Sequence, residues 1–312
     1  MNGARVLDAR ATAAALDPEA VVAAVAVALS AISDGTASAP PRVAAFAPGG
    51  LLGAMPGYVP GLGLGAKLVS VFADPGHAGR SAHRGVVVLF DERDGSVLAV
   101  MDGEPITEVR TAAVATVAMR ALARPGARRV AVIGTGSQAA AQVALLAALH
   151  PDLPLMVGGR RPSAAAALAA RHPNGTSAGI EDAVRAAEIV LCCTDARTPV
   201  LDHSWLVPGA HVGSVGGFHG PEIPADTVAS ATLFAEWPGA AASPLPAGAH
   251  ELQGVPPERV TLLGDVLAGR HRGRVSESEI TFFKSTGHAA FDVAAAHVVH
   301  TRSREEGSGL LL

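Results

Sequence analysis

Apolar strand-like runs alternate with alanine-rich helical stretches through the second part of the chain. A long helical stretch starts at Thr107 and ends before Arg124-Pro125-Gly126. Beyond it the alternating segments are residues 130–133, 155–157, 163–171, 189–193 and 211–215, with a further unit starting at 260–267. Helices that alternate with short apolar runs are typical of a parallel sheet covered on both faces. The pattern therefore predicts an α/β, doubly wound domain, followed by a final helix over 286–300.

The residues before this region have a different pattern. Asp17, Pro18 and Gly35 supply an N-cap, an N1 proline and a C-terminal stop for a first helix. Segments interrupted by glycines follow this helix, and they contain strand-like runs at 66–72 and 85–90. Asp94-Gly95 stands between 86–90 and 97–101, which predicts a β-hairpin. We expect an N-terminal α+β domain.

The run from Arg128 to Ala139 reads RRVAVIGTGSQA, an apolar strand that breaks into a glycine turn and opens a helix. Gly134 suits the tight turn, Gly136 lets the backbone approach a pyrophosphate, and Ala139 permits close packing of helix on strand. The helix N-terminus then offers N–H groups and a partial positive charge to the phosphates. The sequence predicts a dinucleotide site that comprises Gly134, Thr135, Gly136, Ser137, Gln138 and Ala139.

Length and composition change the picture in two ways. A chain of 312 residues with 49% hydrophobic residues is long enough for two cores. We place the boundaries at 1–112 with 285–312, and at 113–284. The only two cysteines, Cys192 and Cys193, are adjacent, so they suit a buried strand better than a structural disulfide or a metal site.

A net charge of −4 with 17% charged residues provides no basic field for nucleic acid or anionic lipid. The longest apolar helical run, residues 21–32, is shorter than the roughly 20 residues that span a bilayer. No charged segment with a cleavage site precedes it. We expect a cytoplasmic protein without a membrane or nucleic-acid partner. The histidines show no ligand spacing, so no metal is expected.

Several motifs in fixed order resemble the ornithine cyclodeaminase and mu-crystallin family. They are residues 63–70 (GLGAKLVS), 107–113 (TEVRTAA), the glycine turn, 199–201 with 205–211, and 280–287 (ITFFKSTG). The resemblance covers nearly the whole chain. It implies a Rossmann-type nucleotide domain and an N-terminal domain that is completed by the C-terminal helix, binds substrate and dimerises through its sheet. The small-molecule partner would be an imino or amino acid.

The resemblance also implies roles for three basic residues. Lys67, in an otherwise apolar segment, would be the active-site lysine that passes a proton to or from an imine or amine. Arg42 and Arg110 would hold the substrate carboxylate, for which a planar guanidinium is well shaped. A lysine at a sheet edge and a solvated arginine at position 42 are the ordinary alternatives. Arg110, expected near the start of a helix, needs an anion more clearly because its charge opposes the helix dipole.

The end of the second nucleotide-domain strand bears on the choice of cofactor. NAD enzymes place an Asp or Glu about 20 residues beyond the fingerprint. This chain instead reads Gly158-Gly159-Arg160-Arg161-Pro162. Arg160 and Arg161 favour a 2′-phosphate, so NADP(H) is favoured over NAD(H), unless both arginines lie in a solvated turn. Thr194 is also expected to contact the cofactor.

Two positions depart from the family pattern. Phe218 stands where cyclodeaminases carry a catalytic aspartate, and Ala82 stands where many relatives carry a hydroxyl residue that contacts substrate. Phe218 therefore predicts an aromatic wall for substrate, or simple packing, rather than ornithine cyclisation. His83 and His219 are weaker substrate-binding candidates. Asp292 matches an acidic family position expected to be structural or to lie near the core of the substrate domain.

These observations predict an NAD(P)H-dependent oxidoreductase that reduces a carboxylate-bearing cyclic imine, of the pyrroline- or piperideine-2-carboxylate type, to an amino acid. An NAD-dependent amino-acid dehydrogenase or ornithine cyclodeaminase is the first alternative. The second is an NADPH-dependent ligand-binding protein with little turnover. Family resemblance, and no residue pattern, suggests a homodimer.

Overall fold

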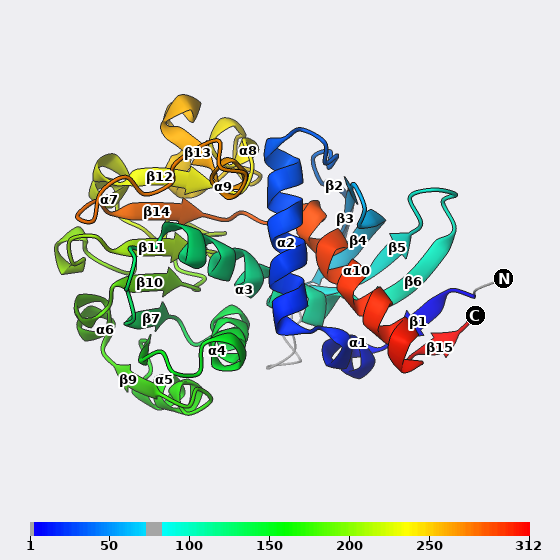
Figure 1. Cartoon of the computed structure of the whole chain (residues 1–312), viewed down its shortest axis with the longest axis horizontal. Coiled ribbons are helices and arrows are strands. Elements are labelled where there is room, and N and C mark those ends of the chain that lie inside the picture. Colours follow the sequence, from blue (N-terminus) through cyan, green and yellow to red (C-terminus); the bar gives the residue numbers. More distant parts are fainter. Residues whose placement is uncertain (1–2, 73–82) are drawn as a thin grey trace. The chain divides into compact units, whose positions relative to one another are not determined.

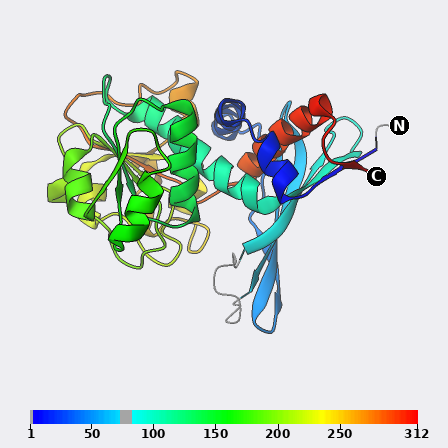
Figure 2. The same ribbon diagram turned by 90° about the horizontal axis from the view of Figure 1, so that it is seen from below.

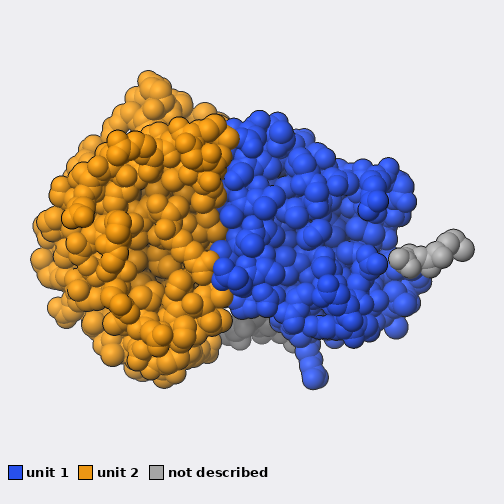
Figure 3. Space-filling view, in the orientation of Figure 1, with its two compact units in different colours: residues 1–110, 288–312 blue, residues 111–287 orange. Residues whose placement is uncertain are grey.

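A computed structural model describes residues 3–72 and 83–312, without the side chain of His83. The chain divides into two compact units, which Figure 3 colours separately. Unit 1 comprises Met1–Arg110 and His288–Leu312, and unit 2 comprises Thr111–Gly287. The expected boundaries, after residue 112 and before residue 285, lie two and three residues from these divisions.

Unit 2 contains an eight-stranded sheet in the order β13-β12-β14-β11-β10-β7-β8-β9. All of its neighbouring strands are parallel. The strands are β7 (Val130–Ile133), β8 (Leu155–Gly158), β9 (Gly175–Ala178), β10 (Ile189–Cys192), β11 (His211–Ser214), β12 (Thr232–Ala235), β13 (Val260–Leu262) and β14 (Thr281–Lys284). The order reverses between β7 and β10, which is the switch point at which such sheets bind dinucleotides. Unit 2 is thus the predicted doubly wound α/β fold.

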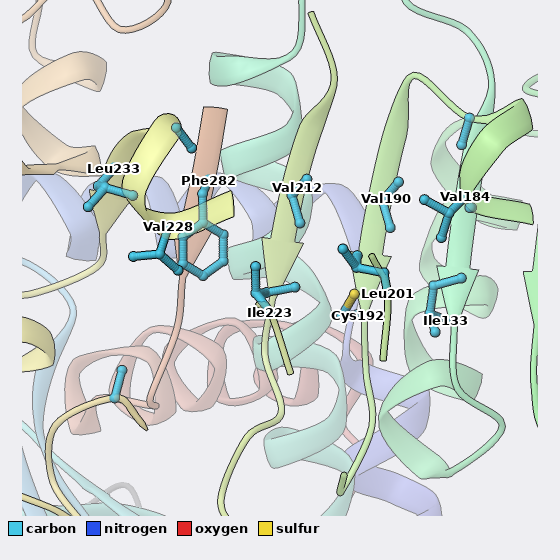
Figure 4. Packing of buried hydrophobic residues seen from close by; sticks show 14 of the residues in the cluster. Ile133, Val184, Val190, Cys192, Leu201, Val212, Ile223, Val228, Leu233 and Phe282 are labelled. Atoms are coloured by element: carbon cyan, nitrogen blue, oxygen red, sulfur yellow. The ribbon is translucent and has the colours of Figure 1, made fainter. Parts of the chain in front are cut away.

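Alternate residues of each strand enter the packing layers on opposite faces of this sheet, because the side-chain period of a strand is two. One layer contains Ile133, Val190 and Phe282, which Figure 4 shows together with Val184 of α6 and Val228 of α7. The other layer contains Val132 and Leu191. Helices α4 (Ser137–Leu149), α5 (Pro162–Ala169) and the second half of α3 (Gly103–Leu122) cover this second face, while α6 (Ile180–Ala186), α7 (Ala225–Ser230) and α8 (Gly239–Ala242) cover the first. Figure 2 shows helices on both sides of the sheet.

Both cysteines are buried and free, Cys192 as the last residue of β10 and Cys193 directly after it. Short elements complete unit 2: η1 (His203–Trp205), η2 (His250–Leu252), η3 (Pro257–Arg259) and α9 (Leu263–Leu267).

Unit 1 contains a seven-stranded sheet in the order β15-β1-β6-β5-β4-β3-β2. Only the β1–β6 pair is parallel. The strands are β1 (Arg5–Leu7), β2 (Val43–Ala47), β3 (Gly50–Val59), β4 (Gly63–Phe72), β5 (His83–Phe90), β6 (Val97–Asp102) and β15 (Leu310–Leu311). Helix α10 (Ala289–Glu306) packs along β3, β4 and β5 and against α2 (Pro18–Ser33), and α1 (Ala9–Ala15) contacts α10 (Figure 1).

Local signals set several of these elements as expected. The Asp17 side chain accepts a hydrogen bond from the backbone N–H of Ala20 at 2.9 Å and caps α2. Gly35, just beyond this helix, has φ +69°. Gly95, with φ +73°, turns the chain between the antiparallel strands β5 and β6.

Two predicted helix boundaries were wrong. Helix α3 starts at Gly103 rather than Thr107, because the Asp102 side chain accepts a hydrogen bond from the N–H of Glu104 and starts the helix earlier. Helix α10 runs from Ala289 to Glu306 rather than from 286 to 300, since its N-cap is His288 and it ends at Gly307 with φ +69°.

Within the described residues, no single helix is both long and apolar enough to cross a membrane, although α1 and α2 pass that test when taken together as a bent pair. Over the same residues, no three His, Cys, Asp or Glu side chains are grouped so that they could hold a metal ion.

Candidate active site

Lys67 lies in the middle of β4, on the sheet face that packs against α10. Its neighbours across the sheet are Met55 and Val87. On the same face, a Cβ at Gly57 would lie 3.1 Å from the Cβ of Ala289, and one at Gly65 would lie 3.1 Å from a methyl of Val293. These glycines allow the first turns of α10 to approach the sheet closely, so Lys67 is buried although it belongs to a two-layer structure.

Two polar side chains contact the Lys67 ammonium. Its Nζ donates to Thr107 Oγ1 at 2.5 Å, and it lies 3.7 Å from Asp292 Oδ1. Thr107 donates its own hydroxyl proton to the backbone oxygen of Gly103, one turn back in α3, at 2.6 Å. The Thr107 oxygen is therefore oriented as an acceptor for Lys67.

Arg110 shares the same carboxylate. Its Nε donates to Asp292 Oδ1 at 3.1 Å, and both side chains are buried. Because α3 starts at Gly103, Arg110 lies two turns inside the helix, and the expected conflict with the helix dipole at its start does not apply. The anion that Arg110 requires is Asp292. The other carboxylate oxygen of Asp292, Oδ2, is buried and has no hydrogen-bond partner among the residues that the structure describes.

The charges around Lys67 shift its protonation. Desolvation by burial is the largest cause that lowers the pKa of Lys67, and the cations Arg110 and Arg42 lower it further, whereas Asp292 raises it. Burial lowers the pKa of His288, the N-cap of α10, to about 4, so its imidazole is neutral near pH 7. Arg42 itself is exposed, in the segment before β2.

This cluster of Lys67, Arg42, Arg110 and Asp292 carries three cationic groups and one carboxylate. The excess of positive charge favours binding of an anion, and two guanidinium groups can hold a carboxylate. A buried amine with a lowered pKa gives up its proton more readily than an exposed lysine, so it can exchange a proton with a nitrogen of the bound molecule. The cluster can therefore hold a small organic acid and move one proton.

The glycine turn of unit 2 follows β7, at the switch point of the sheet. Gly134 has φ +125°, and a Cβ there would lie 2.5 Å from the backbone oxygen of Cys193. Only glycine fits both the conformation and the space. Ala139, the third residue of helix α4 (Ser137–Leu149), is fully buried against the sheet.

The turn also fits a phosphate group. A Cβ at Gly136 would meet nothing within 4 Å. Gly136 is the N-cap of the 13-residue helix α4, and no side chain within residues 3–72 and 83–312 caps this helix. The first N–H groups of α4 are therefore available to an anion. Thr135 and Gln138 are partly buried, and Ser137 is exposed.

Arg160 and Arg161 are exposed and follow β8 after Gly159, beside the glycine turn. Gly159 lies against Thr135, whose methyl would be 2.8 Å from a Cβ at that glycine. Thr194 follows β10, and both its N–H and its hydroxyl donate to Glu222 Oε1 at 2.6 Å.

The remaining candidates are spread over both units. Phe218 follows β11 in unit 2, is 63% exposed, and packs edge-on against His219. His219 Nε2 lies 3.5 Å from Asp195 Oδ2. His83 begins β5 of unit 1, but its side chain lies outside the described residues, as does Ala82.

Sequence reasoning missed several charged and polar groups. It assigned no role to Thr107 or His288, and it treated Asp292 as structural rather than as the ion-pair partner of Arg110. The buried groups Glu222, Glu251 and Lys284 of unit 2 were also missed. An acidic residue four positions after a helix N-cap, as in His288 to Asp292, is the one local signal that could have drawn attention to this end of α10.

The family model that describes the ornithine cyclodeaminase/mu-crystallin family matches residues 5–307. The chain belongs to this family. It is 35% identical over 297 residues to Delta(1)-pyrroline-2-carboxylate reductase 2 of Burkholderia ambifaria, with 92% of each chain covered.

Two solved structures of similar fold extend the comparison. The Delta(1)-pyrroline-2-carboxylate reductase of Thermococcus litoralis, in complex with NADH and L-proline, has a TM-score of 0.86 and 25% identity, with 99% of this chain and 100% of that chain covered. An archaeal alanine dehydrogenase dimer with bound NAD has a TM-score of 0.87 and 27% identity, with 99% and 98% covered. Both confirm the predicted Rossmann-type α/β fold for this family member.

Proposed function

We propose that this family member is an NADPH-dependent reductase that converts a carboxylate-bearing cyclic imine, of the pyrroline- or piperideine-2-carboxylate type, to the cyclic amino acid. The observation that carries the proposal is the buried Lys67 with Thr107, Arg110 and Asp292 in a chain that also has the dinucleotide turn. The names of the Burkholderia and Thermococcus relatives support the same substrate class.

In this proposal Arg42 and Arg110 bind the substrate carboxylate. Lys67, held by Thr107 and Asp292, donates a proton to the imine nitrogen. The low exposure of Lys67 keeps water from competing for that proton. The dinucleotide, when bound, supplies the hydride for the imine carbon. The protein contributes the orientation of the substrate and the placement of charged groups around it.

NADPH rather than NADH is proposed because the end of β8 presents two exposed arginines and no acid. Arg160 and Arg161 can bind a 2′-phosphate, whereas an Asp or Glu there would repel it. The relatives of known structure are described with NADH and NAD, so the choice between the two cofactors has to be measured on this chain.

Phe218 supports an imine substrate over ornithine. A phenyl group has no ionisable proton and cannot form an ion pair with an ammonium as a carboxylate does, so it does not support cyclisation of a diamino acid. We propose that Phe218 provides an apolar wall for the ring of the substrate, with His219 beside it. His83 stays a candidate contact to substrate.

A homodimer is also proposed. The sheet face of unit 1 opposite α10 is apolar and exposed, with Leu52 at 50% and Leu64 at 39% exposure. It contains a concavity of about 390 Å³ lined by Pro56, Tyr58, Leu64, Ala66 and Phe90 among others. Large exposed apolar patches are typical of protein–protein interaction sites and ligand grooves. The archaeal alanine dehydrogenase is described as a dimer, which favours a second copy of this chain as the partner.

The deciding experiment follows oxidation of NADPH and NADH at the nicotinamide absorbance with pyrroline-2-carboxylate and piperideine-2-carboxylate. Ornithine with NAD is assayed in parallel for proline and ammonia. Turnover of the imines that is lost in Lys67→Ala and Arg110→Ala supports the proposal. Proline and ammonia from ornithine without imine turnover would make it a cyclodeaminase, and tight NADPH binding without any turnover would make it a binding protein.

A further inference from the structure

Lys284, like Lys67, is a buried lysine in a chain whose other basic Lys and Arg residues are all arginines. The sequence has only two lysines among its 24 basic Lys and Arg residues, and both are buried. Lys284 is the last residue of β14 in unit 2. Its Nζ donates to Ser214 Oγ at 2.7 Å, to the backbone oxygen of Gly216 at 2.9 Å and to Glu251 Oε1 at 3.1 Å. The ammonium thus connects β14 with the segment after β11.

Glu222 connects the same segment with the end of β10. Its Oε1 accepts from the N–H and hydroxyl of Thr194, and its Oε2 accepts from Ser214 Oγ at 2.6 Å and from the N–H of Gly216 at 2.9 Å. The backbone N–H of Glu222 donates to Glu251 Oε1 at 2.8 Å. Lys284, Glu222 and Glu251, here named the triad, thereby hold the chain after three neighbouring parallel strands.

The turn after β11 fits closely against these charged groups. Gly217 has φ +80°, and a Cβ there would lie 2.8 Å from Lys284 Nζ. A Cβ at Gly216 would lie 1.9 Å from the Thr194 backbone oxygen and 2.7 Å from Glu222 Oε1. The backbone positions of Thr194, Gly216 and Gly217 are therefore fixed by the triad.

Such an arrangement is a costly way to stabilise a core. Desolvating a buried ion pair usually offsets its attraction, and apolar side chains of similar volume stabilise a fold at least as well. In addition, Glu251 Oε2 is buried without a hydrogen-bond partner in the described part of the chain. Buried polar groups with directed hydrogen bonds do specify one geometry, which apolar packing does less strictly. A requirement for exact backbone placement accounts for the triad better than stability does.

The location of the triad indicates which ligand requires the exact backbone placement of Thr194, Gly216 and Gly217. A doubly wound sheet binds the two halves of a dinucleotide across its switch point, at the carboxyl ends of the strands. Arg160 and Arg161, on the β8 side, are the proposed contacts to the adenosine half. The triad lies on the opposite side, at the carboxyl ends of β10, β11 and β14.

We propose that Glu222, Lys284 and Glu251 form a positioning network that holds Thr194 and the Gly216–Gly217 backbone for the nicotinamide half of the cofactor. This inference rests on the proposed function, since it presumes a dinucleotide. The triad does not touch the reacting atoms, so its members act through the loops that they hold.

The test compares two ligands by calorimetry. NADPH carries both halves of the cofactor, and adenosine 2′,5′-bisphosphate carries only the adenosine half. Glu222→Gln and Lys284→Met are expected to weaken NADPH binding by about tenfold or more, about 1.4 kcal/mol, while adenosine 2′,5′-bisphosphate binds as in the wild type. Ser214→Ala, which removes one hydroxyl, gives the same readout should Lys284→Met not fold. Glu181→Gln, an exposed acid on α6 of the same unit, is the matched control and changes neither ligand.

Equal weakening of both ligands would mean that the triad only maintains the fold, and would overturn the inference. Unchanged NADPH binding in all variants would overturn it as well. A wild-type protein that binds neither ligand would instead refute the proposed function, so the two failures are distinguishable.

Discussion

Replacing Asp292 with Asn tests how the charge cluster of unit 1 controls Lys67. Asparagine has nearly the same shape as aspartate but no charge. Asp292 is the carboxylate that raises the pKa of Lys67, against burial and against the cations Arg110 and Arg42, which lower it. Without this carboxylate, the pKa of Lys67 is expected to fall further.

The size of the change follows from the 3.7 Å between Lys67 Nζ and Asp292 Oδ1. Two unit charges at such a distance attract by about 1 kcal/mol in a water-like medium and by about 4 kcal/mol at an effective dielectric of about 20. Asp292→Asn removes this attraction, so the pKa of Lys67 is expected to fall. Because Lys67 acts as a proton donor in the proposed reaction, activity is lost as the pH rises through its pKa. The alkaline limb of kcat/KM should therefore move to lower pH in Asp292→Asn.

A second assay reads the same pKa without turnover. An amine-specific reagent modifies only the free base, and peptide mass spectrometry assigns the product to Lys67 or Lys284, the two lysines of the chain. The pH midpoint for modification of Lys67 should fall in Asp292→Asn and return toward the wild-type value in Asp292→Glu. Glu306→Gln, at the other end of α10, removes an exposed carboxylate and leaves the midpoint unchanged. An unchanged or higher Lys67 midpoint in Asp292→Asn would refute the reasoning.

Three further predictions concern the rest of the molecule. Gly134→Ala should lower the free energy of unfolding of unit 2 by about 1–3 kcal/mol in urea, because φ +125° and the Cys193 oxygen exclude a side chain. Gly136→Ala should keep the stability of the wild type and lose dinucleotide affinity. Equal stability of the two variants would contradict this account of the turn. Replacing both Arg160 and Arg161 with Ala should raise KM for NADPH at least about tenfold, because charge-assisted contacts to the 2′-phosphate are lost, and should leave KM for NADH unchanged. A parallel rise in both KM values would argue against a 2′-phosphate site. Burial lowers the pKa of His211 to about 3, so the stability that its neutral form contributes is complete above about pH 6.5 and falls by about 3 kcal/mol by pH 4. Urea unfolding at both pH values should show a smaller loss of stability in His211→Leu than in the wild type. An equal loss would exclude His211 as the cause.

The sequence by itself determined the features that depend on neighbouring residues. The cap of α2 at Asp17, the turn at Gly95 and the glycine turn after β7 each follow from a few consecutive residues, whose side chains and φ angles act locally. The alternation of apolar runs and helices likewise determined the parallel sheet of unit 2, because each helix must cover the strands on either side of it in the chain.

The tertiary structure decided which of the charged residues meet. Arg110 and Asp292 are separated by 182 positions, and no local pattern relates them. The approach of Asp292 to Lys67 is possible because glycines in β3 and β4 let α10 lie close to the sheet. The triad of Lys284, Glu222 and Glu251 was missed for the same reason. The partners of a buried charge come from several separate strands and loops, so only the folded chain brings them within hydrogen-bonding distance.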